Sequence, residues 1–175
     1  MDQSSTAPSG PERVFILQEK LLSIGGDLWI EDSAGNHAFE VDGQAFTIRR
    51  TLRLLDLQGR ELYEINASLM HVHRTFEIKR GEDVVATIQK AFMTFFGDRF
   101  TVTFADGSEL AIGGDIWDHE FSVTRNGEEV LAASRRWFSL HGAHAIRVAP
   151  DFDVALALSL AIALEQMEIE EHQNR

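Results

Sequence analysis

Residues 154–164 read Val154-Ala-Leu-Ala-Leu-Ser-Leu-Ala-Ile-Ala-Leu164, an apolar run in which Ser159 is the single polar residue. These residue types favour a helix, and Asp151 or Asp153 can cap its start by accepting amide hydrogen bonds. A helix that is apolar around its whole circumference must be covered on every side. The sequence therefore predicts a helix over about 153–167 that lies buried at the centre of the fold.

The chain before this run repeats one unit. Apolar residues that mark the unit boundaries recur every 22 to 24 positions, at Leu22, Phe46, Met70, Phe92, Ile116 and Phe138. Near the middle of each unit stands a glycine, at Gly35, Gly59, Gly81, Gly107 and Gly127. The flanking residues alternate apolar and polar, as half-buried strands do. Each unit is therefore interpreted as a β-hairpin that turns at its glycine.

Two turn patterns support the hairpins. Asp32–Gly35 and Asp56–Gly59 share a D-x-x-G pattern, in which the Asp accepts hydrogen bonds from turn amides and the Gly takes a left-handed conformation after a type I turn. Asp106-Gly107 and Asn126-Gly127 are dipeptides favoured in two-residue type I′ turns. We therefore expect type I′ turns at the latter two positions.

The strand count predicts a closed barrel. Five units supply two strands each, and segments 14–18 and 145–148 supply one more at either end, which makes about twelve. A twelve-stranded sheet exposes two edges unless it closes, and a barrel of that size is too wide for its own side chains to fill. The helix over 153–167 can fill that lumen. The fold class is therefore mainly β, a closed twelve-stranded antiparallel β-barrel of repeated hairpins around a buried apolar C-terminal helix.

Length and composition define the rest of the organisation. The chain has 175 residues, 44% hydrophobic and 25% charged, which suits one globular domain over 13–168. Residues 1–12 are rich in Ser and Pro and are expected to be a disordered tail. Residues 169–175 are expected to form an acidic C-terminal tail, and the whole acidic end from Glu165 onward is expected to emerge into solvent.

Charge and cysteine content limit the partners. The net charge of −12 opposes binding to nucleic acid and to anionic bilayers. The apolar run at 154–164 is shorter than the roughly 20 residues that cross a bilayer, so no transmembrane insertion is expected. The chain has no cysteine, which suits a reducing cytoplasm. The sequence leaves the oligomeric state open and is compatible with a monomer.

Several motifs resemble a known family. They are the recurring Lys/Arg-x-Phe-Ser/Thr boundaries, the segment Gly-Asp-Ile-Trp-Asp-His-Glu-Phe at 114–121, the segment Arg-Arg-Trp-Phe-Ser at 135–139, and the closing apolar helix. From about Arg13 to Met167 the chain resembles the LURP-one-related proteins, which belong with the tubby C-terminal domains and the phospholipid scramblases. The resemblance implies a tubby C-terminal-like barrel of twelve strands around a C-terminal helix.

The resemblance also suggests functions. Tubby domains bind phosphoinositide headgroups, and scramblases act at membranes. We therefore expect a non-enzymatic binding or scaffold domain whose outer barrel surface binds a phosphoinositide, another anionic ligand or a protein partner. A scramblase-like membrane-associated protein is the alternative.

Four arginines are the candidate ligand-binding residues. On a strand, Arg49, Thr51 and Arg53 share one face, because side chains two apart point to the same side. Two guanidiniums can therefore converge on a phosphate or carboxylate. Arg135 and Arg136 form a second patch beside aromatic residues. The competing interpretation is a solvated outer strand face. The two patches can form one site only if their strands lie side by side.

Histidines suggest metal or acid–base chemistry without completing a site. The candidates are His71, His73, His119, His141 and His144. Two imidazoles on one strand face can ligate zinc if a third ligand approaches, but no motif supplies that ligand. In Asp118-His119-Glu120, neighbours on a strand would point to opposite faces. We therefore expect no metal, no cofactor and no catalytic residues, and a metal-dependent enzyme is only a second alternative.

Overall fold

The computed structural model describes residues 13–18, 28–43, 51–70, 73–94, 97–116, 118–136 and 143–173. Its elements are the strands β1 (Arg13–Gln18), β2 (Leu28–Asp32), β3 (His37–Asp42), β4 (Thr51–Leu55), β5 (Glu61–Met70), β6 (His73–Arg80), β7 (Asp83–Thr94), β8 (Gly97–Phe104), β9 (Glu109–Asp115), β10 (Glu120–Arg125), β11 (Glu128–Ser134) and β12 (Ala143–Val148), and the helix α3 (Val154–Gln173). The predicted strand count is confirmed.

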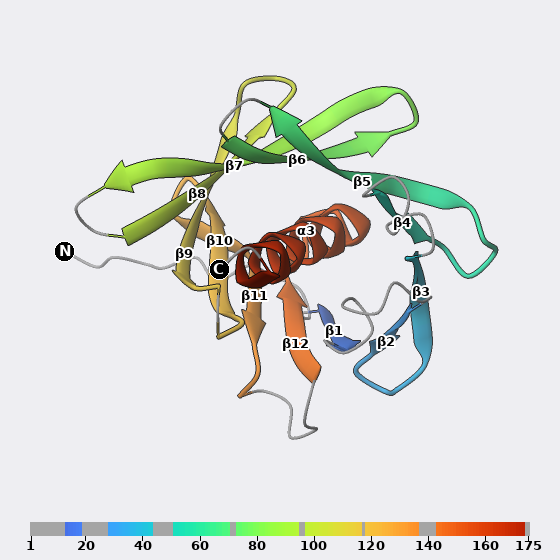
Figure 1. The fold of residues 1–175 in the computed structure, drawn as a ribbon. Coiled ribbons are helices and arrows are strands. Elements are labelled where there is room, and N and C mark those ends of the chain that lie inside the picture. The colour runs from blue at the N-terminus through green and yellow to red at the C-terminus, as the bar shows by residue number, and fades with distance from the viewer. Residues whose placement is uncertain are drawn as a thin grey trace.

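The twelve strands close into a single antiparallel barrel (Figure 1). Each strand pairs with its neighbours in sequence, and β1 closes the ring by pairing with both β2 and β12. The β1–β12 pairing sets Arg13 opposite Val148 and Leu17 opposite His144. Because each of the twelve described strands has two neighbours, none of them presents a free sheet edge, which removes the aggregation hazard of an open sheet.

Hairpin turns follow the predicted chemistry at most positions. In the β2–β3 turn the Gly35 amide donates to the Asp32 carbonyl at 3.0 Å, and the Asp32 carboxylate accepts from the Ala34 amide at 2.8 Å. Asn126 and Gly127 have φ of 53° and 85°, which is the predicted type I′ geometry. In the turn between β4 and β5, the hydrogen bond from the Arg60 backbone amide lowers the pKa of the Asp56 carboxyl group.

One turn differs from the prediction. At Asp106-Gly107, Gly107 has φ of +83° but Asp106 does not have a positive φ, so the turn is not type I′. The Gly107 amide instead donates to the Phe104 carbonyl at 2.9 Å, and the Asp106 carboxylate accepts from the Ser108 amide at 2.9 Å. The turn is therefore a type I turn followed by a left-handed glycine. The Asp106 side chain favours this turn because its carboxylate accepts a hydrogen bond from the Ser108 amide.

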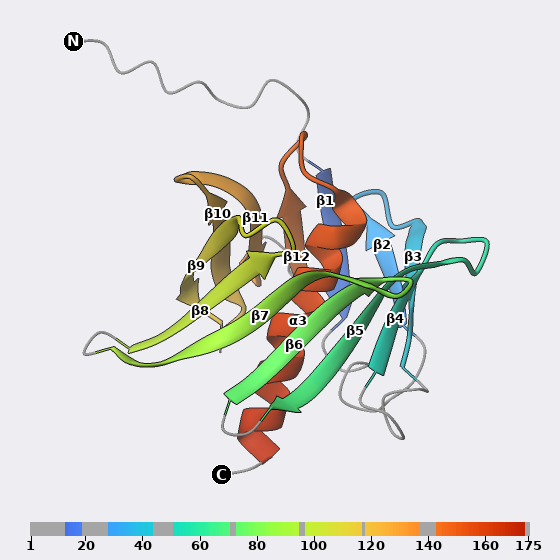
Figure 2. The ribbon, with the colours of Figure 1, turned by 90° about the horizontal axis from the view of Figure 1, so that it is seen from above.

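Helix α3 runs lengthwise through the ring of strands (Figure 2). Its residues from Ala157 to Leu164 are 0% exposed, and they pack against apolar side chains from the inner faces of the strands. Alternation along β5, for example, turns Tyr63 and Ile65 inward. The prediction that the apolar helix fills the barrel is confirmed.

The start of the helix is fixed by hydrogen bonds. The Asp153 carboxylate accepts from the Leu156 amide at 2.7 Å, which is the expected N-cap. The Arg13 guanidinium at the start of β1 donates to the carbonyl oxygens of Ala149 and Phe152, each at 2.6 Å. The segment between β12 and α3 is therefore tied to the strand that closes the barrel.

The end of the helix differs from the expectation. Residues to Gln173 are helical, past the predicted end near Met167, because Glu, Gln and Met all favour helix. Glu165 was expected to emerge into solvent, but it is 1% exposed, and Gln166 beside it is 0% exposed. The barrel wall extends beyond the apolar run and covers these polar residues. The expected N-terminal tail, residues 1–12, lies outside the described residues.

Replacing Leu160 by Asp should abolish cooperative folding, because an unpaired charge would be buried in the lumen. Circular dichroism and thermal unfolding measure this. Leu57→Asp is the matched control, since Leu57 is 52% exposed in the turn between β4 and β5 and should change the unfolding free energy by less than about 0.5 kcal/mol. A well-folded Leu160→Asp protein would contradict the central position of the helix.

Candidate functional site

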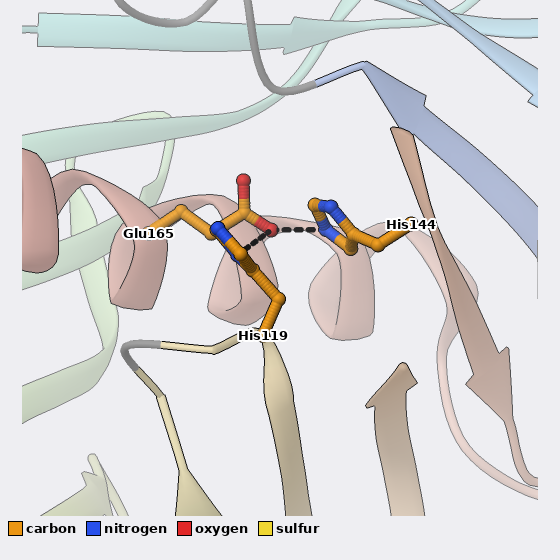
Figure 3. A group of neighbouring side chains, drawn as sticks. All are labelled: His119, His144 and Glu165. Carbon is orange, nitrogen blue, oxygen red and sulfur yellow. Dashed lines mark ion pairs between the residues drawn. The ribbon is translucent and has the colours of Figure 1, made fainter. Parts of the chain in front are cut away.

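Three ionisable side chains meet inside the barrel between the wall and α3 (Figure 3). The Oε1 atom of Glu165 contacts Nε2 of His144 and lies 3.8 Å from Nδ1 of His119. His119 is 7% exposed, His144 is 0% exposed and Glu165 is 1% exposed. We call these three residues the His–His–Glu cluster.

His144 enters the cluster from the inner face of β12. Side chains two apart on a strand share a face, and His144 alternates with Ile146 and Val148, which are both fully buried. The strand register places Leu17 of β1 opposite His144. A polar imidazole therefore occupies a position that the barrel pattern otherwise gives to an apolar side chain.

His119 enters from the turn between β9 and β10. Its φ is +51°, a left-handed conformation that histidine adopts more readily than most residues but still uncommonly. Before the turn, Gly114 lies against β10 so closely that a Cβ atom there would be 2.4 Å from the Glu120 carbonyl oxygen. Strands β9 and β10 therefore approach closely just before and after the turn. Within the turn, His119 points its imidazole towards the inside of the barrel (Figure 3).

Glu165 comes from α3, one helical turn after the fully buried Ala161. A carboxylate buried without a partner costs several kcal/mol, so this position requires compensating groups. The two imidazoles supply them: their rings stack with centroids 4.8 Å apart and planes 17° apart, beside the same carboxylate oxygen. The cluster therefore joins the helix to two separate parts of the wall.

The cluster has two chemical capacities. Imidazole and carboxylate groups in contact can share a proton, and two imidazole nitrogens with one carboxylate oxygen can ligate a metal ion. The three ligand atoms all lie within 4.8 Å of one another. The cluster lies inside the wall, and its three side chains are between 0% and 7% exposed.

Sequence reasoning named two members of this cluster and missed the third. His119 and His144 were both metal candidates without a third ligand, and the strand argument for residues 118–120 was wrong because His119 lies in a turn. Glu165 was assigned to the solvated end. Its burial could have been anticipated from its position directly after Leu164, the last residue of the apolar run. His71 and His141 lie outside the described residues.

Arg53, the first described arginine of the predicted ligand site, lies on β4. Its Nε atom is 3.4 Å from a carboxylate oxygen of Glu61 and 3.9 Å from one of Glu64, and its side chain is 39% exposed. The guanidinium therefore already faces two carboxylates on the neighbouring strand. Arg49, its predicted partner, lies outside the described residues.

Arg135 and Arg136 follow the end of β11 and surround Glu120 of β10. Their backbone amides donate to Glu120 Oε1 at 3.1 and 3.3 Å, and Nε of Arg136 lies 3.8 Å from the same oxygen. The Ser134 hydroxyl donates to this carboxylate as well, at 3.0 Å. The Arg136 side chain is 86% exposed, so it remains accessible from solvent.

The strand order separates the two arginine patches. In the closed barrel β4 lies between β3 and β5, whereas β11 lies between β10 and β12. Strand β4, which carries Arg53, and strand β11, after which Arg135 and Arg136 follow, are therefore not neighbours. A single anion cannot bridge the two patches through adjacent strands.

Comparisons with known proteins agree with this architecture. A family model described as LURP-one-related matches residues 13–165. The uncharacterized protein YxjI of Bacillus subtilis (strain 168) is 28% identical over 154 residues, which cover 87% of this chain and 92% of that protein. An X-ray structure of a protein from Arabidopsis thaliana superposes with a TM-score of 0.68 at 18% identity, covering 92% of this chain and 93% of the other. At that identity the structural likeness shows the fold alone.

Replacing Gly114 by Ala should destabilise the fold by about 2 kcal/mol or more, because the new Cβ meets backbone atoms and φ at this position is +98°. Gly113→Ala is the matched control in the same strand: no atom lies within 4 Å of its Cβ position and its φ is not positive. Urea unfolding measures both. Equal effects would show that the close approach does not shape the turn.

Replacing Glu165 by Ala should lower the unfolding free energy by about 1–3 kcal/mol, because it removes the carboxylate that two buried imidazoles face. Glu129→Ala removes a carboxylate that is 42% exposed and pairs with Arg147 at 2.7 Å on the surface, so it should cost less than about 1 kcal/mol. Chemical denaturation of the two variants gives the comparison. A Glu165→Ala cost as small as that of Glu129→Ala would mean that the cluster contributes little to folding.

Proposed function

The chain belongs to the LURP-one-related family, and we propose that it is a non-enzymatic binding domain that meets its ligand or partner on the outer wall of the barrel. The observation that carries this proposal is the occupied lumen. Where a wide barrel would hold a ligand, this one holds α3, with residues such as Leu158 and Leu160 at 0% exposure. Recognition is then left to the outer faces of the strands and to the turns.

The position of the His–His–Glu cluster supports a non-enzymatic role. General acid–base groups must come within about 3 Å of the substrate atom that they protonate or deprotonate. The three side chains are between 0% and 7% exposed, behind the barrel wall. In the described part of the chain these side chains are therefore shielded from a substrate in solution.

An anionic ligand is the first version of the proposal, and Arg135 and Arg136 are its best candidates. Exposed ion pairs such as Arg136 with Glu120 are worth about 0–1 kcal/mol, so a multiply charged phosphate can displace the carboxylate. The net charge of −12 opposes such binding at long range. We therefore expect modest affinity that falls with rising salt concentration.

A protein partner is the second version, and Trp29 is its best candidate. Trp29 faces outward on β2, is 38% exposed, and stacks on His37 of β3 with ring centroids 4.5 Å apart and planes 6° apart. A partly exposed tryptophan held in one orientation is the kind of residue that dominates protein interfaces. This version does not depend on the charge of the partner.

The cellular setting is part of the proposal. Among the described residues, no helix is long and apolar enough to cross a bilayer. The lack of cysteine supports a cytoplasmic location, where structural disulfides are rare.

Cosedimentation with vesicles containing a phosphoinositide, combined with pull-down from a cell extract, tests the proposal. The double variant Arg135→Ala/Arg136→Ala should bind the vesicles about 30-fold more weakly, since each basic residue near a charged surface contributes about 1 kcal/mol. Trp29→Ala should instead weaken capture of a protein partner by a similar factor. Arg60→Ala is the control, because its side chain is 77% exposed on another turn.

The results separate the versions. Vesicle binding that all variants retain would contradict the anionic version, and partner capture that Trp29→Ala leaves unchanged would contradict the protein version. If the protein binds neither the vesicles nor a protein partner and instead converts a substrate to product, the non-enzymatic proposal is overturned.

A further inference from the structure

We propose that the His–His–Glu cluster is a binding site for one divalent transition-metal ion of the zinc class, held between the barrel wall and the central helix. The ligands are Nδ1 of His119, Nε2 of His144 and Oε1 of Glu165. This inference concerns the interior of the barrel and is independent of the binding proposed for its outer wall.

The donor set has the composition of a zinc site. Zinc binds imidazole nitrogens and carboxylate oxygens at about 2.0–2.2 Å, and three protein ligands with two His and one Glu are a recurring combination. Calcium and magnesium prefer oxygen ligands, which this cluster supplies only through Glu165. The chemistry of the donors therefore selects a transition metal over the hard divalent cations.

The three donor atoms lie near one another, at spacings that differ from those around a bound ion. Tetrahedral ligands at about 2.1 Å from zinc lie about 3.4 Å from one another. Here Nδ1 of His119 is 3.8 Å from Glu165 Oε1, and all three donor atoms lie within 4.8 Å. To hold one ion, Nε2 of His144 and Oε1 of Glu165, which are in direct contact, would have to move apart, and the two stacked imidazoles would have to rotate so that both face the ion. Water would complete the fourth position.

Charge gives a second reason for a cation at this place. The Glu165 carboxylate is buried beside two imidazoles that stack with centroids 4.8 Å apart. A divalent ion held by these side chains would compensate the charge of the buried carboxylate.

The backbone at His119 is consistent with a demanding ligand position. His119 keeps a left-handed φ of +51°, and the turn before it depends on the close packing of Gly114. Uncommon backbone conformations of this kind concentrate at functional sites. The conformation directs the imidazole towards Glu165 and His144 (Figure 3).

A metal at this position would act structurally. The ligands come from the β9–β10 turn, from β12 and from α3, so one ion would crosslink two parts of the wall to the helix. The hydrogen bonds of Arg13 and the Asp153 cap fix the start of α3, and the ion would fix it further along. Metal loading should therefore raise the thermal unfolding temperature.

Titration of chelator-treated protein with Co²⁺ and Zn²⁺ tests the site. We expect uptake of one Co²⁺ per chain, with the visible absorption of a tetrahedral nitrogen–oxygen site, displacement of that ion by Zn²⁺, and a higher unfolding temperature in the loaded protein. His119→Asn should weaken binding at least about 100-fold, since even residues that only support metal ligands cost 10–100-fold. Asn is chosen because it tolerates a left-handed φ.

His37→Ala is the matched control, because His37 is an exposed histidine of β3 and its loss should leave metal affinity unchanged. In ¹⁵N-labelled wild-type protein, zinc should shift the ring nitrogens of two histidines and leave those of His37 in place, a measurement that needs no variant to fold. Substoichiometric uptake in the wild type, or equal weakening by His37→Ala and His119→Asn, would overturn the site. In that case the cluster is a proton-sharing group only.

Discussion

The structure depends on one constraint, the need to keep an apolar helix out of water on every side. Its residues from Ala157 to Leu164 are completely buried, and no flat or open sheet could cover all of them. A closed ring of twelve strands can, and each strand contributes one apolar face to the enclosure. Closure also leaves every strand paired on both sides. Closure of the barrel therefore both covers the helix and pairs the strand edges that an open sheet would expose.

Polar groups then decide how the helix sits inside this enclosure. Apolar packing is not directional, so it tolerates sliding and rotation of a helix whose sides are alike. At the start, Asp153 caps the helix and Arg13 holds the preceding carbonyl groups. Further along, Glu165 is matched by His119 and His144 from the wall. These directional contacts define a single register of the helix in an otherwise uniform apolar lumen.

The central helix also limits what the inside of the barrel can hold. In the described part of the chain α3 occupies the lumen, and the side chains that solvent reaches lie on the outer wall and in the turns. On that wall the described arginines of the predicted ligand site already face carboxylates: Arg53 faces Glu61 and Glu64, and Arg136 faces Glu120. Neighbouring carboxylates therefore partly compensate these two cations.

The amino-acid sequence by itself determined the hairpin repeat, the strand number, the buried helix and the family, because these follow from periodicity and turn chemistry within each short segment. It also limited the N-cap to Asp151 or Asp153, and the structure shows that Asp153 caps the helix. Two predictions were wrong. The turn at Gly107 is of type I, because the Asp106 carboxylate accepts a hydrogen bond from the Ser108 amide. The helix continues to Gln173, past its predicted end near Met167. Only the tertiary structure decided the His–His–Glu cluster and the separation of the two arginine patches. His119, His144 and Glu165 come from three elements, and only the closure of the barrel around the helix brings them together.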